Sequence, residues 1–98
     1  GPITQSELDE LMAALADVPQ VILITTALPD EPRYDFKIAN NALIYDTVAT
    51  HPNATLVDWG GLAAGCVGDC FYADGIHMKS TGAQYYADVV GSFVKPTE

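Results

Sequence analysis

The sequence predicts an α/β fold that forms half of a doubly wound, three-layer sandwich with parallel strands. Two short apolar runs, Gln20–Ala27 and Thr55–Trp59, have the composition of strands buried on both faces. Helical patterns precede, separate and follow these runs, and strands that alternate with helices indicate a parallel sheet. Two strands alone would leave sheet edges unpaired and apolar faces uncovered. We therefore expect the remaining strands of the sheet to lie outside this chain.

The first helix is expected to begin after Thr4 and to end near Asp17. Thr4 and Glu7 have the spacing of a capping box, and Ile3 is placed to pack on Leu8. Apolar residues then recur at helical spacing, which indicates a face that packs on the core rather than a cofactor site. They are Leu8, Leu11, Met12 and Leu15.

Two further helices and two loops complete the expected order. Pro29 and Pro32 end the first strand and make the residues from 28 to 35 a loop. A helix over residues 36–49 should turn Ala39, Leu43, Ile44 and Val48 inward. The glycine-rich stretch from 60 to 75 is expected to be one long loop. The final helix should span residues 80–93, with Tyr86, Val89, Val90 and Phe93 facing inward.

The charge of the chain excludes several classes of partner. The 98 residues contain 4 Lys and Arg against 13 Asp and Glu, which gives a net charge of −9. Nucleic acid and anionic lipid both require basic patches, so neither is expected as a partner. No apolar stretch reaches the roughly 20 residues that a membrane span needs. Any attachment to a membrane is expected through a separate transmembrane domain.

The two cysteines, Cys66 and Cys70, lie four residues apart in the stretch CVGDC. Three interpretations are open: a local disulfide, two free thiols, or part of a zinc site. A zinc site needs about four ligands, and the two histidines of the chain leave that set hard to complete. We favour the disulfide and predict no metal and no cofactor. A disulfide would in turn indicate an oxidising compartment, at the cell surface, in a periplasm or outside the cell.

Asp74 and His77 form the chemically most informative pair in the chain. A histidine that acts as a general base needs a partner to fix its tautomer and stabilise its protonated form, and a nearby carboxylate does both. Gly75 gives the backbone freedom that lets the carboxylate turn back onto the imidazole. The same two residues also fit a simpler role as a cap of the final helix. The spacing alone does not decide between these roles.

The surrounding sequence resembles the SGNH (GDSL-type) hydrolase superfamily. The stretches that carry the resemblance are VILITTALP, NNALIYD, ATLVDW and above all YADGIHMKSTGAQYYADVV, whose Asp-x-x-His matches the last motif of that superfamily. The likeness is greatest to the extracytoplasmic SGNH domains of peptidoglycan O-acetyltransferases and related membrane acyltransferases. It implies that residues 1–98 are the C-terminal portion of one flavodoxin-like SGNH domain. Gly1-Pro2 would then follow the Gly-x-Asn motif of the superfamily, or be a remnant of tag removal.

The resemblance also implies roles for individual residues. His77 would take the proton from a serine nucleophile, and Asp74 would orient His77. The Gly-Asp-Ser motif of the superfamily and its oxyanion-hole glycine and asparagine are absent from this sequence. Ser80 lies close to His77, but it stands at a helix entry, where capping is the more common role. Trp59 and Ile76 are candidates for contact with substrate, and Trp59 fits packing in the core or at the rim of a pocket equally well.

The expected function is that of a serine O-acyltransferase or esterase acting on cell-envelope glycan or a similar hydroxyl acceptor. This chain would supply the Asp-His arm of the triad, and an N-terminal half, in the same precursor or a companion chain, would supply the serine and the oxyanion hole. No catalysis is expected from this chain alone. The partners would be an acyl donor and a glycan-type acceptor, outside the cytoplasm of a bacterium. The alternative is a non-catalytic, degenerate SGNH-like module used for binding or assembly.

Overall fold

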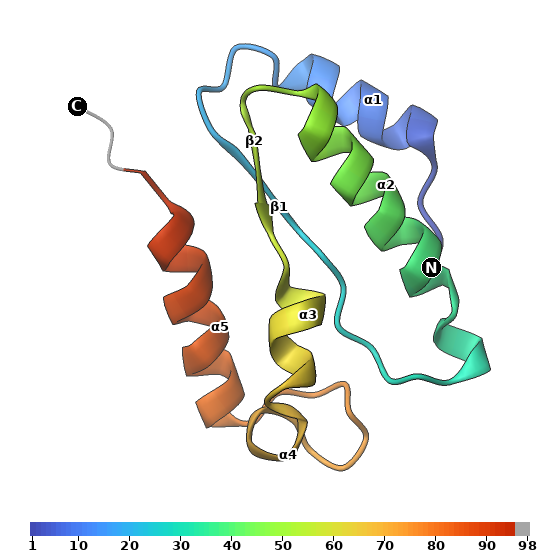
Figure 1. Cartoon of the computed structure of the whole chain (residues 1–98), viewed down its shortest axis with the longest axis vertical. Helices are drawn as coiled ribbons and strands as arrows, with labels where there is room; N and C mark the ends of the chain where they lie inside the picture. Colours follow the sequence, from blue (N-terminus) through green and yellow to red (C-terminus); the bar gives the residue numbers. More distant parts are fainter. Residues whose placement is uncertain (96–98) are drawn as a thin grey trace.

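The computed structural model describes residues 1–95 as two parallel strands and a set of helices (Figure 1). The long helices confirm the prediction closely: the capping box of Thr4 and Glu7 is formed, and the final helix spans the predicted residues. In chain order the elements are α1 (Gln5–Ala14), β1 (Val21–Ile24), a 3-10 turn η1 (Pro32–Tyr34), α2 (Phe36–Thr50), β2 (Ala54–Val57), α3 (Trp59–Ala64), α4 (Val67–Cys70) and α5 (Ser80–Phe93).

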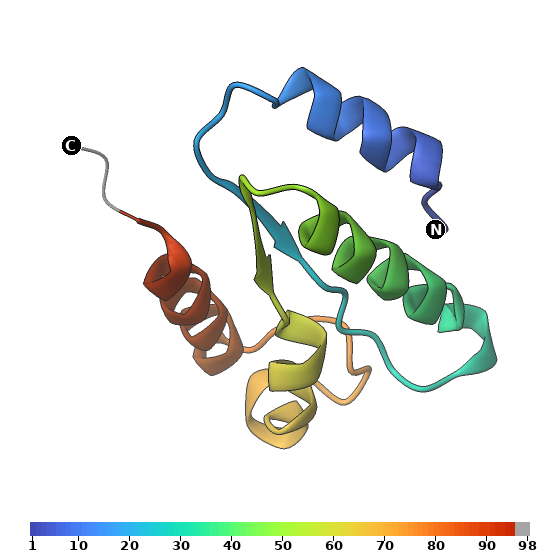
Figure 2. The same cartoon turned by 45° about the horizontal axis from the view of Figure 1, so that its top comes forward.

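The two strands form the middle layer of the molecule. β1 and β2 are parallel, with Val21 opposite Ala54 and Ile24 opposite Val57. Helices α1 and α2 lie on one side of the strands and α5 lies on the other, as Figures 1 and 2 both show. The predicted α/β class, with parallel strands between helices, is therefore confirmed.

A first cluster of buried side chains fills the space between the strands and the helices α1 and α2. Because alternate residues of a strand point to opposite faces, Val21 and Leu23 share one face of β1. They contact Met12 of α1 and Ile44 of α2, and all four side chains are buried. Leu15 packs against the same cluster, as the periodicity of the first helix predicts, and so does Ile3, whereas Leu11 of the predicted stripe is exposed. Ala39, expected to face inward, is exposed instead, and Asn40 takes the buried position.

A second cluster surrounds Trp59 and joins α3 to α5. Trp59 is 5% exposed and packs against Phe71, Tyr85 and Tyr86, with the ring centroid of Tyr86 at 5.0 Å in an edge-to-face arrangement. At the other end of α5, the Gln20 side chain donates to the Phe93 carbonyl. These contacts fix α5 along the sheet face opposite α1 and α2.

The stretch from 60 to 75 differs from the single long loop that we predicted. α3 and α4 occupy most of it, and Trp59 begins α3 rather than ending the second strand. The glycines of this stretch led to the wrong prediction, because glycine is a poor helix former in isolation. Asp58 overrides that preference, since its side chain caps α3 by accepting a hydrogen bond from the Gly61 amide.

Asp58 also joins the carboxyl ends of the two strands. Its Oδ1 accepts hydrogen bonds from the Thr25 hydroxyl at 2.8 Å and from the Tyr45 hydroxyl at 3.0 Å. Thr25 in turn accepts a hydrogen bond from the Gly60 amide. The bond from Thr25 is the main cause that lowers the pKa of Asp58, and the bonds from Tyr45 and Gly61 act in the same direction against the effect of burial. This group of hydrogen bonds, here called the Asp58 clasp, links β1, α2, β2 and α3.

One edge of β1 has no neighbouring strand among residues 1–95. Val21 and Thr25 donate their amides to carbonyls of residues 53 and 57, on the β2 side. Since successive residues alternate in direction, Ile22 and Ile24 direct their peptide groups toward the opposite edge. At the end of that edge, the side-chain amide of Asn41 pairs with both the N–H and the C=O of Thr26. Asn41 thus satisfies at Thr26 the groups that another strand would satisfy.

We predict that Thr25→Val destabilises the chain by about 1–3 kcal/mol, because it leaves the half-buried Gly60 amide and Asp58 each without one partner. Urea unfolding followed by circular dichroism measures this change. Thr55→Val is the matched control on β2, because no hydrogen bond of its hydroxyl occurs within residues 1–95. Its effect should stay within about 0.5 kcal/mol. Equal losses in the two variants would contradict the importance of the clasp.

Candidate active site

Asp74 and His77 lie in a tight loop between α4 and α5. Phe71 and Met78 form an antiparallel bridge at the base of the loop, and the Tyr72 amide donates to the His77 carbonyl at 2.9 Å. Gly75 closes the tip, with its amide bonded to the Tyr72 carbonyl. Gly75 has φ of +70°, a conformation that residues with a Cβ rarely adopt. Backbone hydrogen bonds therefore give the loop a defined shape.

The two side chains are in direct contact. Oδ2 of Asp74 lies 2.5 Å from Nδ1 of His77. The other oxygen of Asp74, Oδ1, accepts hydrogen bonds from the backbone amides of Ile76 at 2.9 Å and His77 at 3.0 Å. The carboxylate is thus held by two backbone donors while it contacts the ring. This arrangement fixes Nδ1 as the nitrogen that faces Asp74 and leaves Nε2 on the opposite side of the imidazole.

The same contacts control the ionisation of Asp74. The hydrogen bond from the His77 ring is the largest cause that lowers the pKa of the Asp74 carboxyl, and together with the bonds from the amides of Ile76 and His77 it brings that pKa to about 2. Asp74 is therefore a carboxylate over the whole neutral range. Both side chains are open to solvent, and His77 is 78% exposed. The chemistry that this pair supports is proton transfer at Nε2, with Asp74 stabilising the protonated ring.

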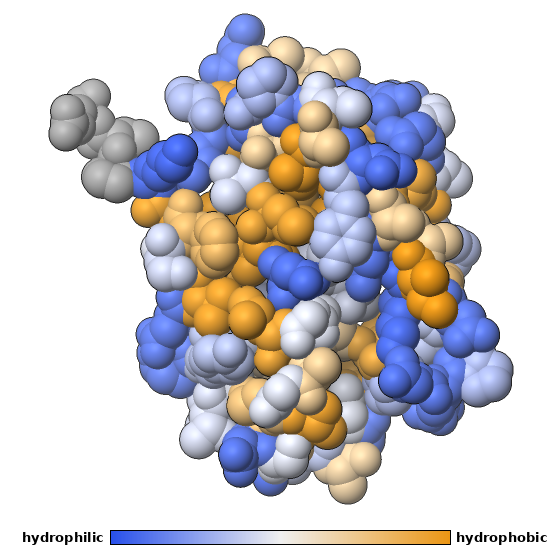
Figure 3. All heavy atoms as spheres, viewed as in Figure 1, coloured by the Kyte–Doolittle hydropathy of each residue, from blue (hydrophilic) through white to orange (hydrophobic). Residues whose placement is uncertain are grey.

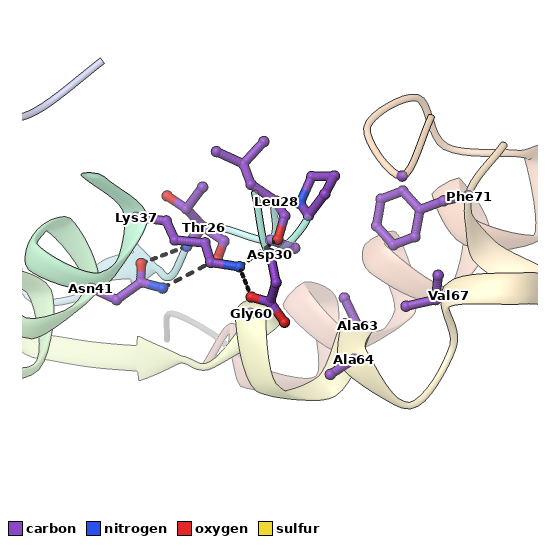
Figure 4. Close-up of a pocket in the computed structure, with 13 residues that line it drawn as sticks. Thr26, Leu28, Asp30, Lys37, Asn41, Gly60, Ala63, Ala64, Val67 and Phe71 are labelled. Carbon is purple, nitrogen blue, oxygen red and sulfur yellow. Dashed lines mark hydrogen bonds and ion pairs between the residues drawn. The ribbon is translucent and has the colours of Figure 1, made fainter. Parts of the chain in front are cut away.

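A pocket lies beside the loop, at the carboxyl end of β1. It has a volume of about 510 Å³ and is lined mainly by apolar side chains. Figure 4 shows Lys37 and Asn41 of α2 on one side and Ala63, Ala64 and Val67 on the other. Lys37 donates to the Leu28 carbonyl at 2.7 Å and forms an ion pair with Asp30, which lowers the pKa of Asp30. Gly75 is a lining residue, so the pocket adjoins the Asp74–His77 loop.

The other predicted site residues are Trp59, Ile76 and Ser80, and none of their side chains forms a hydrogen bond with Asp74 or His77 within residues 1–95. Trp59 lies in the core around α3 and does not line the pocket, and Ile76 is half-buried and contributes its amide to Asp74. Ser80 is the first residue of α5, where Lys79 takes the N-cap position, so the expected cap by Ser80 is absent. The hydrogen bonds within residues 1–95 include none between a serine hydroxyl and His77.

Cys66 and Cys70 form the disulfide that the sequence analysis favoured, with 5.4 Å between their Cα atoms. Cys70 is buried and Cys66 lies at the start of α4. Among the residues that the structure describes, no group of three or more His, Cys, Asp or Glu side chains is placed to hold a metal ion. In the same part of the chain, no helix combines the length and the apolar character needed to cross a membrane.

Sequence reasoning missed three residues that shape the site. Asn41 and the Asp58 clasp fix the loop and the helix that follow β1 and β2, and Pro29 contacts the Asp74–His77 loop. A Cβ placed on Gly75 would come within 2.9 Å of Cγ of Pro29. Asp58 lies within the strand predicted over Thr55–Trp59, yet an aspartate three residues before Gly61 is also a helix-capping signal that could have been recognised. The partners of Asn41 and Pro29 are distant in sequence and have no such signal.

Comparison with known proteins finds a relative whose function is stated. The chain is 32% identical over 94 residues to the peptidoglycan O-acetyltransferase OatA of Listeria monocytogenes serovar 1/2a. This chain is a distant relative of a peptidoglycan O-acetyltransferase. The alignment covers 94% of the chain but only 14% of OatA, so the chain spans a small part of that relative's length. No protein-family model matches the chain.

We predict that His77→Ala raises the pKa of Asp74 from about 2 toward 3.8, because it removes the largest cause of the shift. The pKa of Asp74 should return only part of the way to 3.8, since the two backbone amides can still donate hydrogen bonds to the carboxylate. Carbon-detected NMR titration of the Asp74 carboxyl measures it. His51→Ala is the control, because the His51 ring bonds to the Thr47 carbonyl and not to a carboxylate.

The direction of the pKa shift also determines a pH dependence of stability. A carboxyl whose pKa is lowered in the folded state stabilises that state above its ordinary pKa of 3.8, and the effect disappears as pH falls through about 2. The unfolding free energy should therefore fall less steeply between these values in Asp74→Asn than in the unaltered chain. Parallel slopes would contradict the assigned hydrogen bonds.

Proposed function

We propose that this chain is the C-terminal portion of an SGNH-type serine O-acyltransferase or esterase, in which Asp74 and His77 are the acid–base arm of the triad. The observation that carries the proposal is the contact between Asp74 and Nδ1 of His77, in a loop whose backbone holds the carboxylate in place. The likeness to OatA supports the same assignment, because that relative is named a peptidoglycan O-acetyltransferase.

The proposed reaction has two steps that use His77 in opposite senses. In the first, Nε2 accepts the proton of a serine hydroxyl as the serine oxygen attacks the carbonyl carbon of an acyl donor, and the proton then passes to the leaving group. In the second, Nε2 accepts the proton of a sugar hydroxyl or of water, which attacks the acyl-serine ester. The proton then returns to the serine oxygen as the ester bond breaks. Asp74 stays ionised and stabilises the protonated imidazole in both steps.

The serine and the oxyanion-hole donors would come from a further segment, in the same polypeptide or a companion chain. The unpaired edge of β1 supports this, because Ile22 and Ile24 direct peptide groups toward a place where another parallel strand can pair. Figure 3 shows hydrophobic residues gathered on the surface between α5 and the strands. Such a patch on one face is typical of a surface that another element covers.

The setting that we propose is the bacterial cell envelope, outside the cytoplasm. The disulfide between Cys66 and Cys70 supports an oxidising compartment. The acceptor would be a hydroxyl of the envelope glycan, and any membrane attachment would come from a separate domain. The reaction as proposed uses no metal or cofactor.

The experiment joins this chain to a segment that carries a Gly-Asp-Ser motif, as one polypeptide or as two companion pieces. A fluorophosphonate probe should label the serine, and His77→Ala should reduce the labelling rate at least about 1,000-fold, since residues of a triad act as a unit. His51→Ala, the matched histidine control, should label at the unaltered rate. Absence of labelling when both segments are folded and associated would overturn the proposal and favour a non-catalytic binding module.

A further inference from the structure

The disulfide closes a helix that is too short to be stable by itself. α4 has only 4 residues, and Gly68 is one of them. Isolated helices shorter than about 12 residues are marginal in water, and glycine weakens them further. The Cys70 amide donates to the Cys66 carbonyl at 2.7 Å, so one hydrogen bond and the disulfide close the same turn. The covalent bond therefore holds a turn that the local sequence favours only weakly.

This turn is where α5 is anchored. The last carbonyl groups of a helix have no partner within the helix. In α4 the carbonyls of three successive residues accept hydrogen bonds from the beginning of α5. The Gly68 carbonyl binds Nζ of Lys79 at 3.1 Å, the Asp69 carbonyl binds the Thr81 hydroxyl at 2.5 Å, and the Cys70 carbonyl binds the Lys79 amide at 2.8 Å.

Gly82 makes this close approach possible. It is buried in the first turns of α5, and a Cβ at this position would overlap the carbonyl group of Cys70. A residue larger than glycine would push α5 away from α4. Gly91, on the same helix, has no atom within 4 Å of the place where a Cβ would stand. The two glycines of α5 therefore differ in function, although both are poor helix formers.

The contact between α4 and α5 sets the two ends of the Asp74–His77 loop. Phe71 follows Cys70 directly and Met78 precedes Lys79, and these two residues form the bridge at the base of the loop. Any change in the separation of α4 and α5 is therefore transmitted to the bridge. His77 is next to Met78, and Asp74 depends on the same loop for its two backbone hydrogen bonds.

We propose that the Cys66–Cys70 disulfide and Gly82 are positioning residues for the Asp74–His77 pair. They act by holding the Cys70 carbonyl against the start of α5. The inference rests on the proposed function only for its catalytic consequence, since the geometric part concerns the loop itself. Neither Cys70 nor Gly82 touches the His77 ring in this role.

The first test compares Gly82→Ala with Gly91→Ala. The pair is matched because both changes add one methyl group to α5 and raise helix propensity equally. Gly82→Ala should move the Asp74–His77 loop and return the pKa of Asp74 from about 2 toward 3.8, whereas Gly91→Ala should leave it near 2. NMR titration of the carboxyl is the measurement, and circular dichroism checks that each variant is folded. A folded Gly82→Ala variant that keeps Asp74 near 2 would overturn the role of Gly82.

The second test removes the disulfide. If Gly82→Ala does not fold, this test decides whether the contact between α4 and α5 positions the Asp74–His77 pair. The chain with Cys66→Ser and the chain treated with a phosphine reductant should both show the pKa of Asp74 raised toward 3.8 while α1 and α2 remain folded. An unchanged Asp74 titration in both would overturn the positioning role of the disulfide.

Activity is a separate readout. In the complete enzyme, labelling by the fluorophosphonate probe should slow by about 10- to 100-fold in the disulfide-free form, the scale expected for a small misplacement of a catalytic group. Failure of the unaltered enzyme to label would contradict the proposed function and leave the result on the loop intact. A disulfide-free enzyme that labels at the full rate would overturn the positioning role even where the loop has moved.

Discussion

The carboxylate of Asp58 is the interaction on which the arrangement of the other elements depends. One side chain accepts hydrogen bonds from Thr25 at the end of β1, from Tyr45 on α2 and from Gly61 in the first turn of α3. A sheet of two strands has little side-chain packing to fix its register, since each strand has a single neighbour. The Asp58 clasp fixes the register of the two strands at their carboxyl ends. These are the ends from which the pocket and the loops of the candidate site extend.

Polar side chains in this chain make backbone hydrogen bonds of the kind that neighbouring strands make in a larger sheet. Asn41 pairs with both peptide groups of Thr26 on the open side of β1. Asn40 does the same for the N-terminal residues, accepting from the Ile3 amide and donating to the Gly1 carbonyl. The backbone is thus satisfied where it leaves the sheet, while Ile22 and Ile24 keep groups directed toward the open edge. An unpaired edge of this kind is a place where a further strand can pair.

Local patterns predicted the helices and the strands, because the signals that define them lie within a few residues. The capping box of Thr4 and Glu7 and the apolar stripe of α1 are examples, and α5 matches its predicted span. The strands are shorter than predicted. β1 ends at Ile24, after which the Thr25 hydroxyl and the Thr26 backbone bond to side chains 15 to 33 residues away in sequence, and β2 ends at Val57, where Asp58 caps α3. The stretch from 60 to 75 was predicted wrongly because its glycines disfavour an isolated helix. Its helices depend on the cap by Asp58 and on contacts with α5 rather than on propensity.

The contact between Asp74 and His77 was within reach of the sequence, because both residues lie in one loop and Gly75 marks its turn. The pocket beside that loop was not, since its walls come from the loop after β1, from α2 and from α3 and α4. The exposure of the pair carries a physical consequence. An ion pair open to water contributes little, because solvent screens it and competes for its hydrogen bonds. Here the geometry is instead held by backbone amides and by the disulfide-closed turn. A pair preorganised in this way can stay in place while exposed. In the function that we propose, a further segment that covers the pair and excludes water would strengthen its electrostatic interactions.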